Sequence, residues 1–283
     1  LMQSQNLVTK HAMKILKQNE SILASAKKQD ALEEFRKLPY PKEKEEDWRY
    51  TEIEKLKLEN FEPFESQSKI EISELSPELL KQGVIFTDIN TALEKYSAAS
   101  NYFFRDTKIS KNKFVALNAA FFTNGYFLYV PKNIEIKEPL RSVIHVEGKS
   151  NVIHNLIIAE QNSSFGFVEE YENLGNTGEQ LNVSVTEVYV NTHSRVNFHH
   201  LNHFGNNTTS IINIAGSAER NASINWVSGC FGGKLNRIRM DTNFNGQGSN
   251  CSNLGIFFGK GKEHIDFTTN VYHNAENTTN DIL

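Results

Sequence analysis

The amino-acid sequence predicts a mainly β protein, in which a parallel β-helix, or solenoid, follows a helical N-terminal region. Two observations lead to this prediction. The composition changes after about residue 113, where lysine and glutamate give way to Asn, Gly, Ser, Thr, Phe and Ile. Beyond that point strand-like segments repeat with a period near 28 residues. Fixed periods of about 20 to 50 residues are typical of solenoids and other repeat proteins.

The first third of the chain is charged and carries an amphipathic helical pattern, because apolar residues recur at three- and four-residue steps. These positions are Leu7/Val8, His11/Ala12, Ile15/Leu16, Ile22/Leu23, Ala26, Ala31/Leu32 and Phe35. Pro39 and Pro41 end the pattern, since proline cannot continue a helix. The stretch SELSPELLKQG (Ser73–Gly83) predicts a further short helix, with Pro77 in its first turn and a glycine C-cap. Residues 1–82 are therefore predicted to form a helical N-terminal region.

A connecting α/β segment is predicted over residues 83–123, because VIFTD is typical of a strand and NTALEKY of a helix. In the following FFTNGYFLYVPKN, the pair Asn124-Gly125 predicts a hairpin turn ahead of the strand YFLYV. From there the chain is strand-like to its last residue, so residues 124–283 are the predicted β-helix core.

Two interleaved families of strands make up this predicted core. The first comprises SSFGFVEEY, SRVNFHHLN, ASINWVSGC and SNLGIFFGK, which align at Ser164, Arg195, Ser223 and Ser252, in steps of 31, 28 and 29. The second comprises LNVSVTEVYV, TSIINIAGS, LNRIRMDTNF and EHIDFTTNVYH, which align at Asn182, Ser210, Asn236 and Glu263, in steps of 28, 26 and 27. A shared period indicates a solenoid with two long strands per coil, stacked in parallel. An eight-strand antiparallel sandwich is the main alternative, and the repeat favours the solenoid.

The bulk properties exclude several classes of function. A net charge of −4 and a pI near 6.2, with 30 basic residues offset by 34 acidic ones, predict binding to neither nucleic acid nor a membrane surface. No segment resembles a transmembrane span, and the first twenty residues lack the apolar run of a signal peptide. Two cysteines without C-x-x-C spacing predict neither a disulfide framework nor a zinc site. A reducing, intracellular compartment fits best.

Several N-x-S/T sequons point the other way, towards a secreted glycoprotein. Five of them begin at Asn162, Asn182, Asn221, Asn250 and Asn277. Because no secretion signal accompanies them, we interpret them as structural Asn and Ser/Thr residues at turns.

The stretch RVNFHHLNHF (Arg195–Phe204) holds three histidines within five residues, and His193 lies just upstream. On a helix, His199 and His203 would share a face and could bind one metal ion. On a strand the same pair lies about 13 Å apart, which is too far for one zinc ion with bonds of about 2 Å. A strand chelate would need i,i+2 spacing, which these histidines do not have.

Strand alternation divides this stretch into two faces, with Val196 and Phe198 on the core face. The residues of the other face are Arg195, Asn197, His199, Leu201 and His203. His200 therefore points away from His199. The sequence predicts solvated or partner-facing histidines and assigns no metal ligand among them.

The cysteines, the acidic residues and the glycine-rich stretch are also given no catalytic or ligand-binding role. Cys230 and Cys251 fall at opposite ends of stacked strands, about 25 Å apart, so they are predicted to be free thiols. The acidic candidates are Glu169, Glu170, Glu187, Asp241, Glu263 and Asp266. They form no ladder of carboxylates about 5 to 9.5 Å apart, as glycoside hydrolysis would need. The glycine-rich CFGGK is interpreted as a turn between coils. No catalytic, cofactor-binding or metal-binding residue is assigned.

The stretch KEEDWRYTEIEKL (Lys44–Leu56) places Trp48 and Tyr50 among charged neighbours, just after a proline break. We interpret it as an aromatic anchor that ties the helical part to the following segment, in preference to a binding site. The longer PKEKEEDWRYTEIEKL is similar to an N-terminal motif of the SufD branch of the SufB/SufD family. KFVALNAAFFTNGYFLYVPKNIEIKEPL (Lys113–Leu140) and VYHNAENTTNDIL resemble later motifs of that family, in the same order.

This resemblance implies a right-handed parallel β-helix and a role in iron–sulfur cluster assembly. It implies a cytoplasmic, non-enzymatic scaffold that supports cluster assembly and iron acquisition together with a SufB-like paralogue and a SufC-like ABC ATPase. The chain alone is expected to hold no cofactor, and the cluster to be transient in the full complex. Whether Cys230, Cys251 or the region His193–His203 contacts iron there is left open.

The given sequence ends at Leu283, where members of the family continue. Members of the family continue through F-x-G and S-H-G-A-T segments to a C-terminal helical domain that docks SufC, and the histidine of S-H-G-A-T has no counterpart here. We therefore expect an incomplete solenoid without the docking domain. Its last coil would leave an unpaired edge, through which we expect the chain to form a homodimer in isolation.

Two other functions remain as alternatives, because a fold does not by itself fix a function. A polysaccharide-acting β-helix enzyme would need a secretion signal and a stacked carboxylate array. A structural or adhesive solenoid fits less well with the helical N-terminal region and its W-R-Y-T motif.

Overall fold

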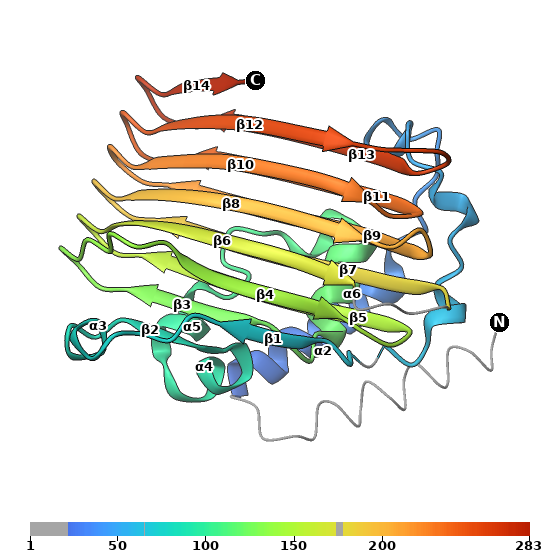
Figure 1. The fold of residues 1–283 in the computed structure, drawn as a ribbon, viewed down its shortest axis with the longest axis horizontal. Helices are drawn as coiled ribbons and strands as arrows, with labels where there is room; N and C mark the ends of the chain where they lie inside the picture. The colour runs from blue at the N-terminus through green and yellow to red at the C-terminus, as the bar shows by residue number, and fades with distance from the viewer. Residues whose placement is uncertain (1–21, 65, 174–177) are drawn as a thin grey trace.

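The computed structural model describes residues 22–64, 66–173 and 178–283. The apolar positions Leu7 to Leu16 of the predicted amphipathic pattern lie outside the described residues. The structure is mainly β and confirms the predicted solenoid behind an N-terminal helical region. Two seven-stranded sheets face each other, and successive coils of the chain stack to build both of them (Figure 1).

We call the two sheets A and B. Sheet B has the order β1 (Lys69–Ile72), β4 (Leu140–Val146), β6 (Ser164–Asn173), β8 (Arg195–Phe204), β10 (Ser223–Gly232), β12 (Asn250–Phe258), β14 (Thr279–Ile282). Sheet A has the order β13 (His264–His273), β11 (Leu235–Phe244), β9 (Thr208–Ala218), β7 (Gln180–Val190), β5 (Ser150–Ala159), β3 (Tyr126–Val130), β2 (Ile85–Asp88). The chain alternates between the sheets, so each coil supplies one strand to each, and from β3 and β4 onwards neighbours pair in parallel. Parallel pairing excludes the antiparallel sandwich.

The register confirms most of the predicted alignment and corrects its last members. Ser164, Arg195 and Ser223 are in register, but Ser223 pairs with Asn250 instead of Ser252. In sheet A, Asn236 pairs with Ile265 instead of Glu263. Each error is two residues, and a shift of two leaves every side chain on the same face of its strand. The polar pattern therefore cannot detect such an error.

A ladder of left-handed turn residues follows one edge of the solenoid. The residues with positive φ at equivalent turns are Asn133, Asn162, His193, Asn221, Gly248 and Asn277. The backbone N–H of each of the first five donates to a carbonyl in the next coil, at 2.9 to 3.1 Å. Asparagine tolerates this conformation better than other non-glycine residues, and His193 occupies the same type of position.

These turns account for three of the five sequons named above. Asn162, Asn221 and Asn277 are turn residues, as predicted. The prediction was wrong for Asn182 and Asn250, which lie in strands β7 and β12. There the amides extend ladders between coils: Asn182 donates to Ser210 Oγ at 2.9 Å, and Asn250 accepts from Ser223 Oγ at 2.9 Å.

The predicted hairpin at Asn124-Gly125 was also wrong. The preceding residues form the buried helix α6 (Lys113–Phe121), so no strand is present on that side of the turn. Asn124 instead forms a parallel bridge with Ile153. At Gly125, with φ of 151°, a Cβ would lie 1.7 Å from the carbonyl oxygen of His154. Glycine is required there by the close approach of β5.

Antiparallel strands cap the first coils. Strand β1 pairs antiparallel with β4, and β2 pairs antiparallel with β3. The expected elements before β3 are confirmed: α3 (Pro77–Lys81) is followed by β2 and α4 (Ile89–Lys95), and Gly83 has φ of 84°. Such terminal caps cover the end of a stack whose interior is apolar. The predicted boundaries after residues 82 and 123 stay a prediction.

The N-terminal helices cover the outer face of sheet A (Figure 1). Helix α2 (Ile22–Lys37) packs on α6, and α6 packs on β5 and β7. Between α2 and β1 the chain forms the short turns η1 (Glu46–Trp48), η2 (Ile53–Lys55) and η3 (Leu58–Phe61). The short helices α5 (Ser97–Tyr102) and η4 (Ile109–Lys111) precede α6. A second apolar core fills the lumen between the two sheets.

The left-handed turn predicts a stability effect at His193. We expect His193→Val to lower the free energy of unfolding by about 1 to 2 kcal/mol, because a branched side chain opposes positive φ. His193→Asn should preserve stability. His199→Val, on the outer face of β8, is the control and should stay within about 0.5 kcal/mol. Urea denaturation measures all three, and equal losses for the two valine variants would contradict the account.

Candidate functional site

Strand β8 distributes its histidines as alternation predicts. Val196, Phe198 and His200 face the lumen, and His200 is completely buried. His199 and His203 lie on the outer face of sheet B. The expectation of solvated or partner-facing histidines was wrong for His200, because its side of the strand faces the other sheet.

His200 belongs to a buried polar network centred on Glu169, which is also completely buried. Its Nδ1 lies 2.8 Å from Glu169 Oε2. Glu169 Oε1 accepts three further hydrogen bonds of 2.8 Å, from the Tyr126 hydroxyl, the Asn155 amide and the Thr186 hydroxyl. Four donors surround this carboxylate, which is the arrangement that permits an ionised group in the interior.

The direction of the hydrogen bonds fixes the state of the histidine. Asn202 presents its amide nitrogen to His200 Nε2 at 3.2 Å, while Asn236 donates to Asn202 Oδ1 at 2.7 Å. His200 Nε2 therefore accepts, and Nδ1 carries the proton that is donated to Glu169. Burial and the Glu169 carboxylate raise the pKa of Tyr126 well above 10, which keeps its hydroxyl a donor.

Ser228 extends this ladder and makes it resemble a Ser-His-Glu triad. Ser142, Glu169, His200 and Ser228 occupy one register position on successive strands of sheet B. A nucleophile would need a hydrogen bond between the serine and the histidine. Among the described residues Ser228 Oγ finds no hydrogen-bond partner, and His200 Nε2 is engaged by Asn202. The ladder holds coils together and lacks the contact that would activate a serine.

Both cysteines are free and buried, as predicted. They lie at opposite ends of paired strands, since Cys251 is opposite Ile224 and Cys230 is opposite Phe257. Burial raises the pKa of the Cys230 thiol to about 12 and that of Cys251 to about 11. Both thiols therefore stay protonated at neutral pH, and a protonated thiol is a poor nucleophile and metal ligand.

A second buried pair lies on the outer face of sheet A, under the helices. His154 Nε2 is 3.2 Å from Glu187 Oε2, without the alignment of a hydrogen bond. Glu187 also accepts from the Phe104 backbone N–H and the Tyr189 hydroxyl, both at 2.8 Å. Phe104 has a φ of 47°, so Glu187 holds an uncommon backbone conformation in place. Burial lowers the pKa of His154 more than the Glu187 carboxylate raises it.

The other acidic candidates take part in contacts on the outer faces. Asp241 pairs with Lys111 and Arg239, and Asp266 pairs with Arg237. Glu170 accepts from Arg141 on the outer face of sheet B, at 2.8 Å. Glu263 accepts from the backbone N–H of Lys260 in the turn before β13.

Trp48 is buried and confirms the predicted aromatic anchor. Its ring lies 5.4 Å from that of Phe114 in α6. The anchor reaches further than the sequence indicated, because the guanidinium carbon of Arg237 in β11 lies 4.1 Å from the centre of the Trp48 ring. Tyr50, by contrast, is 76 % exposed.

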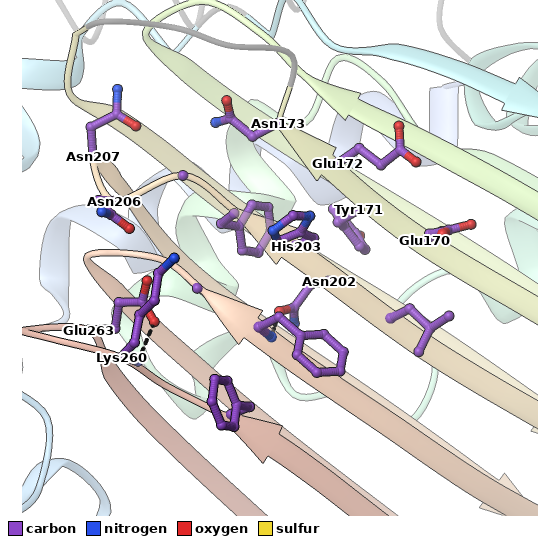
Figure 2. A pocket seen from close by; sticks show the side chains of 16 residues that line it. Glu170, Tyr171, Glu172, Asn173, Asn202, His203, Asn206, Asn207, Lys260 and Glu263 are labelled. Carbon is purple, nitrogen blue, oxygen red and sulfur yellow. Dashed lines mark hydrogen bonds between the residues drawn. The ribbon is translucent and has the colours of Figure 1, made fainter.

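A groove of about 960 Å³ on the outer side of sheet B is lined by accessible charged and polar side chains (Figure 2). His203 lies at its centre, between Glu172 on one side and Lys260 and Glu263 on the other. Phe231, which is 37 % exposed, adds apolar surface. The groove crosses strands from several coils. It offers a mixed apolar and charged surface.

Known families match almost all of the described solenoid. The family model described as "SUF system FeS cluster assembly, SufBD core domain" matches residues 143–283, and that described as "SufBD protein N-terminal region" matches residues 64–142. The chain belongs to the SufB/SufD family. The latter part of the sequence resemblance is thereby confirmed, while the E-D-W-R-Y-T stretch lies before both matched ranges.

Relatives within this family share about a third of the matched residues. The iron–sulfur cluster assembly protein SufD of Bacillus subtilis (strain 168) is 32 % identical over 204 residues, which are 70 % of this chain and 47 % of the relative. An iron–sulfur cluster assembly SufBD family protein of Staphylococcus haemolyticus (strain JCSC1435) is 30 % identical over 221 residues, 77 % of this chain and 47 % of the relative. The chain spans about half the length of these curated relatives. Within the described part of this SufB/SufD chain, no helix has the length and apolar character to cross a membrane.

The buried network predicts a large penalty for breaking it. Glu169→Ala or His200→Ala should each lower the free energy of unfolding by about 3 kcal/mol or more, because the remaining partner stays buried without its hydrogen bond. Glu170→Ala, one residue away on the outer face, should cost less than about 1 kcal/mol. Urea denaturation of the two single variants and the double variant gives the coupling energy. Additive effects would contradict a direct contact.

His154 predicts a loss of stability in acid. Its folded pKa lies below the ordinary value of 6.5, so below that pH the unfolded chain takes up a proton that the folded chain excludes. The free energy of unfolding should fall as pH decreases through 6.5, by at most about 1.4 kcal/mol per pH unit from this group. His154→Gln should flatten that slope between pH 7.5 and 5.5. An unchanged slope would show that other groups cause it.

Proposed function

We propose that the chain is a non-catalytic scaffold subunit of an iron–sulfur cluster assembly complex. Membership of the SufB/SufD family carries this proposal, since the two family models together match residues 64–283. Its setting is the cytoplasm, and it supports cluster assembly and iron acquisition. The cluster is cargo of the assembled complex instead of a resident cofactor of this chain.

The placement of the reactive groups supports a scaffold role. Glu169 and His200, the pair closest to a catalytic arrangement, are sealed in the lumen and hydrogen-bonded to each other and to neighbouring polar side chains. Both thiols are buried, and burial raises their pKa values. The groups that remain accessible, such as His203 and Glu172, lie on a groove suited to contact with another protein.

The proposed partners are a SufB-like paralogue and a SufC-like ABC ATPase. ATP hydrolysis belongs to the ATPase in this scheme, and the present chain contributes rigid surfaces. A homodimer of the isolated chain stays a prediction. The alternative of a polysaccharide-acting or adhesive β-helix gains no support from the acidic residues, because Glu169 and Glu187 are buried and Asp241 is paired with cations.

Co-purification of the natural full-length protein with its neighbours tests the proposal. A stable complex with an ABC-type ATPase and a SufB-like partner is the expected result. If the cells contain both partners and the protein is nevertheless isolated without either of them, the proposal is refuted.

Reconstitution with iron and sulfide gives a second test on the 283-residue chain. We expect no stoichiometric cluster, because the cysteine thiols are buried and protonated. Iron and sulfide analysis with absorption spectroscopy measures the yield. A cluster bound at one per chain and lost in a Cys230→Ser variant would contradict the expectation that this thiol binds no cluster in the isolated chain.

A further inference from the structure

A row of metal-ligating residue types crosses three neighbouring strands on the outer face of sheet B. His145 of β4 is opposite Glu172 of β6, and Glu172 is opposite His203 of β8. Neighbouring strands lie about 4.8 Å apart, so the three side chains leave the sheet on the same side, one coil apart. Figure 2 shows Glu172 and His203 at the groove. Imidazole and carboxylate groups are the ligands of many zinc and other transition-metal sites.

His145 and Glu172 already stand at the spacing of two ligands on one metal ion. His145 Nδ1 lies 3.4 Å from Glu172 Oε2. Two ligands with bonds of about 2.1 Å at tetrahedral angles also lie about 3.4 Å apart. The pair forms no hydrogen bond, because Nδ1 is buried and has no hydrogen-bond partner within the described residues. A metal ion between the two groups would give this buried nitrogen a partner.

The other side of the His145 ring faces a second carboxylate. His145 Nε2 lies 3.7 Å from Glu71 Oε1 of β1. Metal-bound histidines commonly direct their second nitrogen to a carboxylate, which keeps the proton there and leaves the first nitrogen free for the metal. The ammonium group of Lys69, which is opposite His145 on β1, is paired with the same Glu71 carboxylate at 2.6 Å. Its charge is therefore compensated next to the site.

His203 can supply a third ligand by rotation of its side chain. Among residues 22–64, 66–173 and 178–283, no group of three His, Cys, Asp or Glu side chains is already placed to hold a metal ion. His203 is exposed, and the side chain of Glu172 is 41 % exposed, whereas that of His145 is only 13 % exposed. Exposed side chains change rotamer within nanoseconds. The site thus combines one ligand held in place with two that can close on an ion.

We propose that His145 Nδ1, Glu172 and His203 bind one divalent transition-metal ion of the zinc type on the outer face of sheet B. Water from the groove completes a tetrahedral shell, as in sites with three protein ligands. Spacing within one strand does not reveal this site, because its ligands come from three successive coils. The inference goes beyond the proposed scaffold role and does not depend on it.

Calorimetric titration of the chelator-treated 283-residue chain with Zn²⁺ tests the site. We expect one saturable equivalent of zinc, which His203→Ala and Glu172→Gln each remove. Glu71→Gln should weaken this binding by about tenfold or more, since a carboxylate behind a ligand typically contributes such a factor. His199→Ala is the matched control, because it removes a histidine from the same face of β8 outside the row and should leave the affinity unchanged.

Co²⁺ gives a second measurement, because its visible absorption distinguishes a tetrahedral shell from the octahedral aqua ion. We expect a tetrahedral spectrum that Zn²⁺ abolishes by displacement, that His203→Ala eliminates and that His199→Ala retains. Zinc binding that His203→Ala and His199→Ala weaken equally would overturn the proposal, as would the absence of saturable binding to the unaltered chain. Either of these results leaves the co-purification test of the scaffold role unaffected.

Discussion

Parallel backbone pairing between successive coils is the constraint on which the rest of the structure depends. Once the strands are in register, each side chain has its counterpart about 4.8 Å away in the next coil, and alternation assigns it to the lumen or the outside. The constraint places Glu169 beside His200 and directs His199 outwards. It also repeats the turn geometry, so that Asn162, His193 and Asn221 adopt one left-handed conformation.

The same constraint explains why reactive residue types do not amount to a reactive site. A carboxylate in the lumen needs hydrogen-bond donors from several coils, and Glu169 finds them on β3, β5, β7 and β8. These donors stabilise the buried Glu169 carboxylate, and because they occupy both of its oxygens, they leave no oxygen free to bind a substrate. The groove around His203, on the outer side of sheet B, stays accessible.

The sequence was sufficient to predict those features of the fold that depend on a local or periodic pattern of residues. Alternation predicted the faces of β8, and the period near 28 predicted the coil stack. Glu169 and His200 each lie five residues after an aligned lead, Ser164 and Arg195, so their contact could have been predicted by comparing acidic residues with histidines across coils. The two-residue register errors could not be detected, since they preserve every face. The contact of Asp47 with Arg237 joins residues 190 positions apart, which no local pattern encodes.

Stacking of the coils seals Glu169 and His200 in the lumen and leaves His199 and His203 on the outer face of sheet B. Modification of the native protein by diethyl pyrocarbonate, mapped by mass spectrometry, tests it most directly. His203 and His199 should be modified, and His200 should react only after unfolding, because it is completely buried. Modification of His200 in the native protein at the rate of His203 would contradict the account.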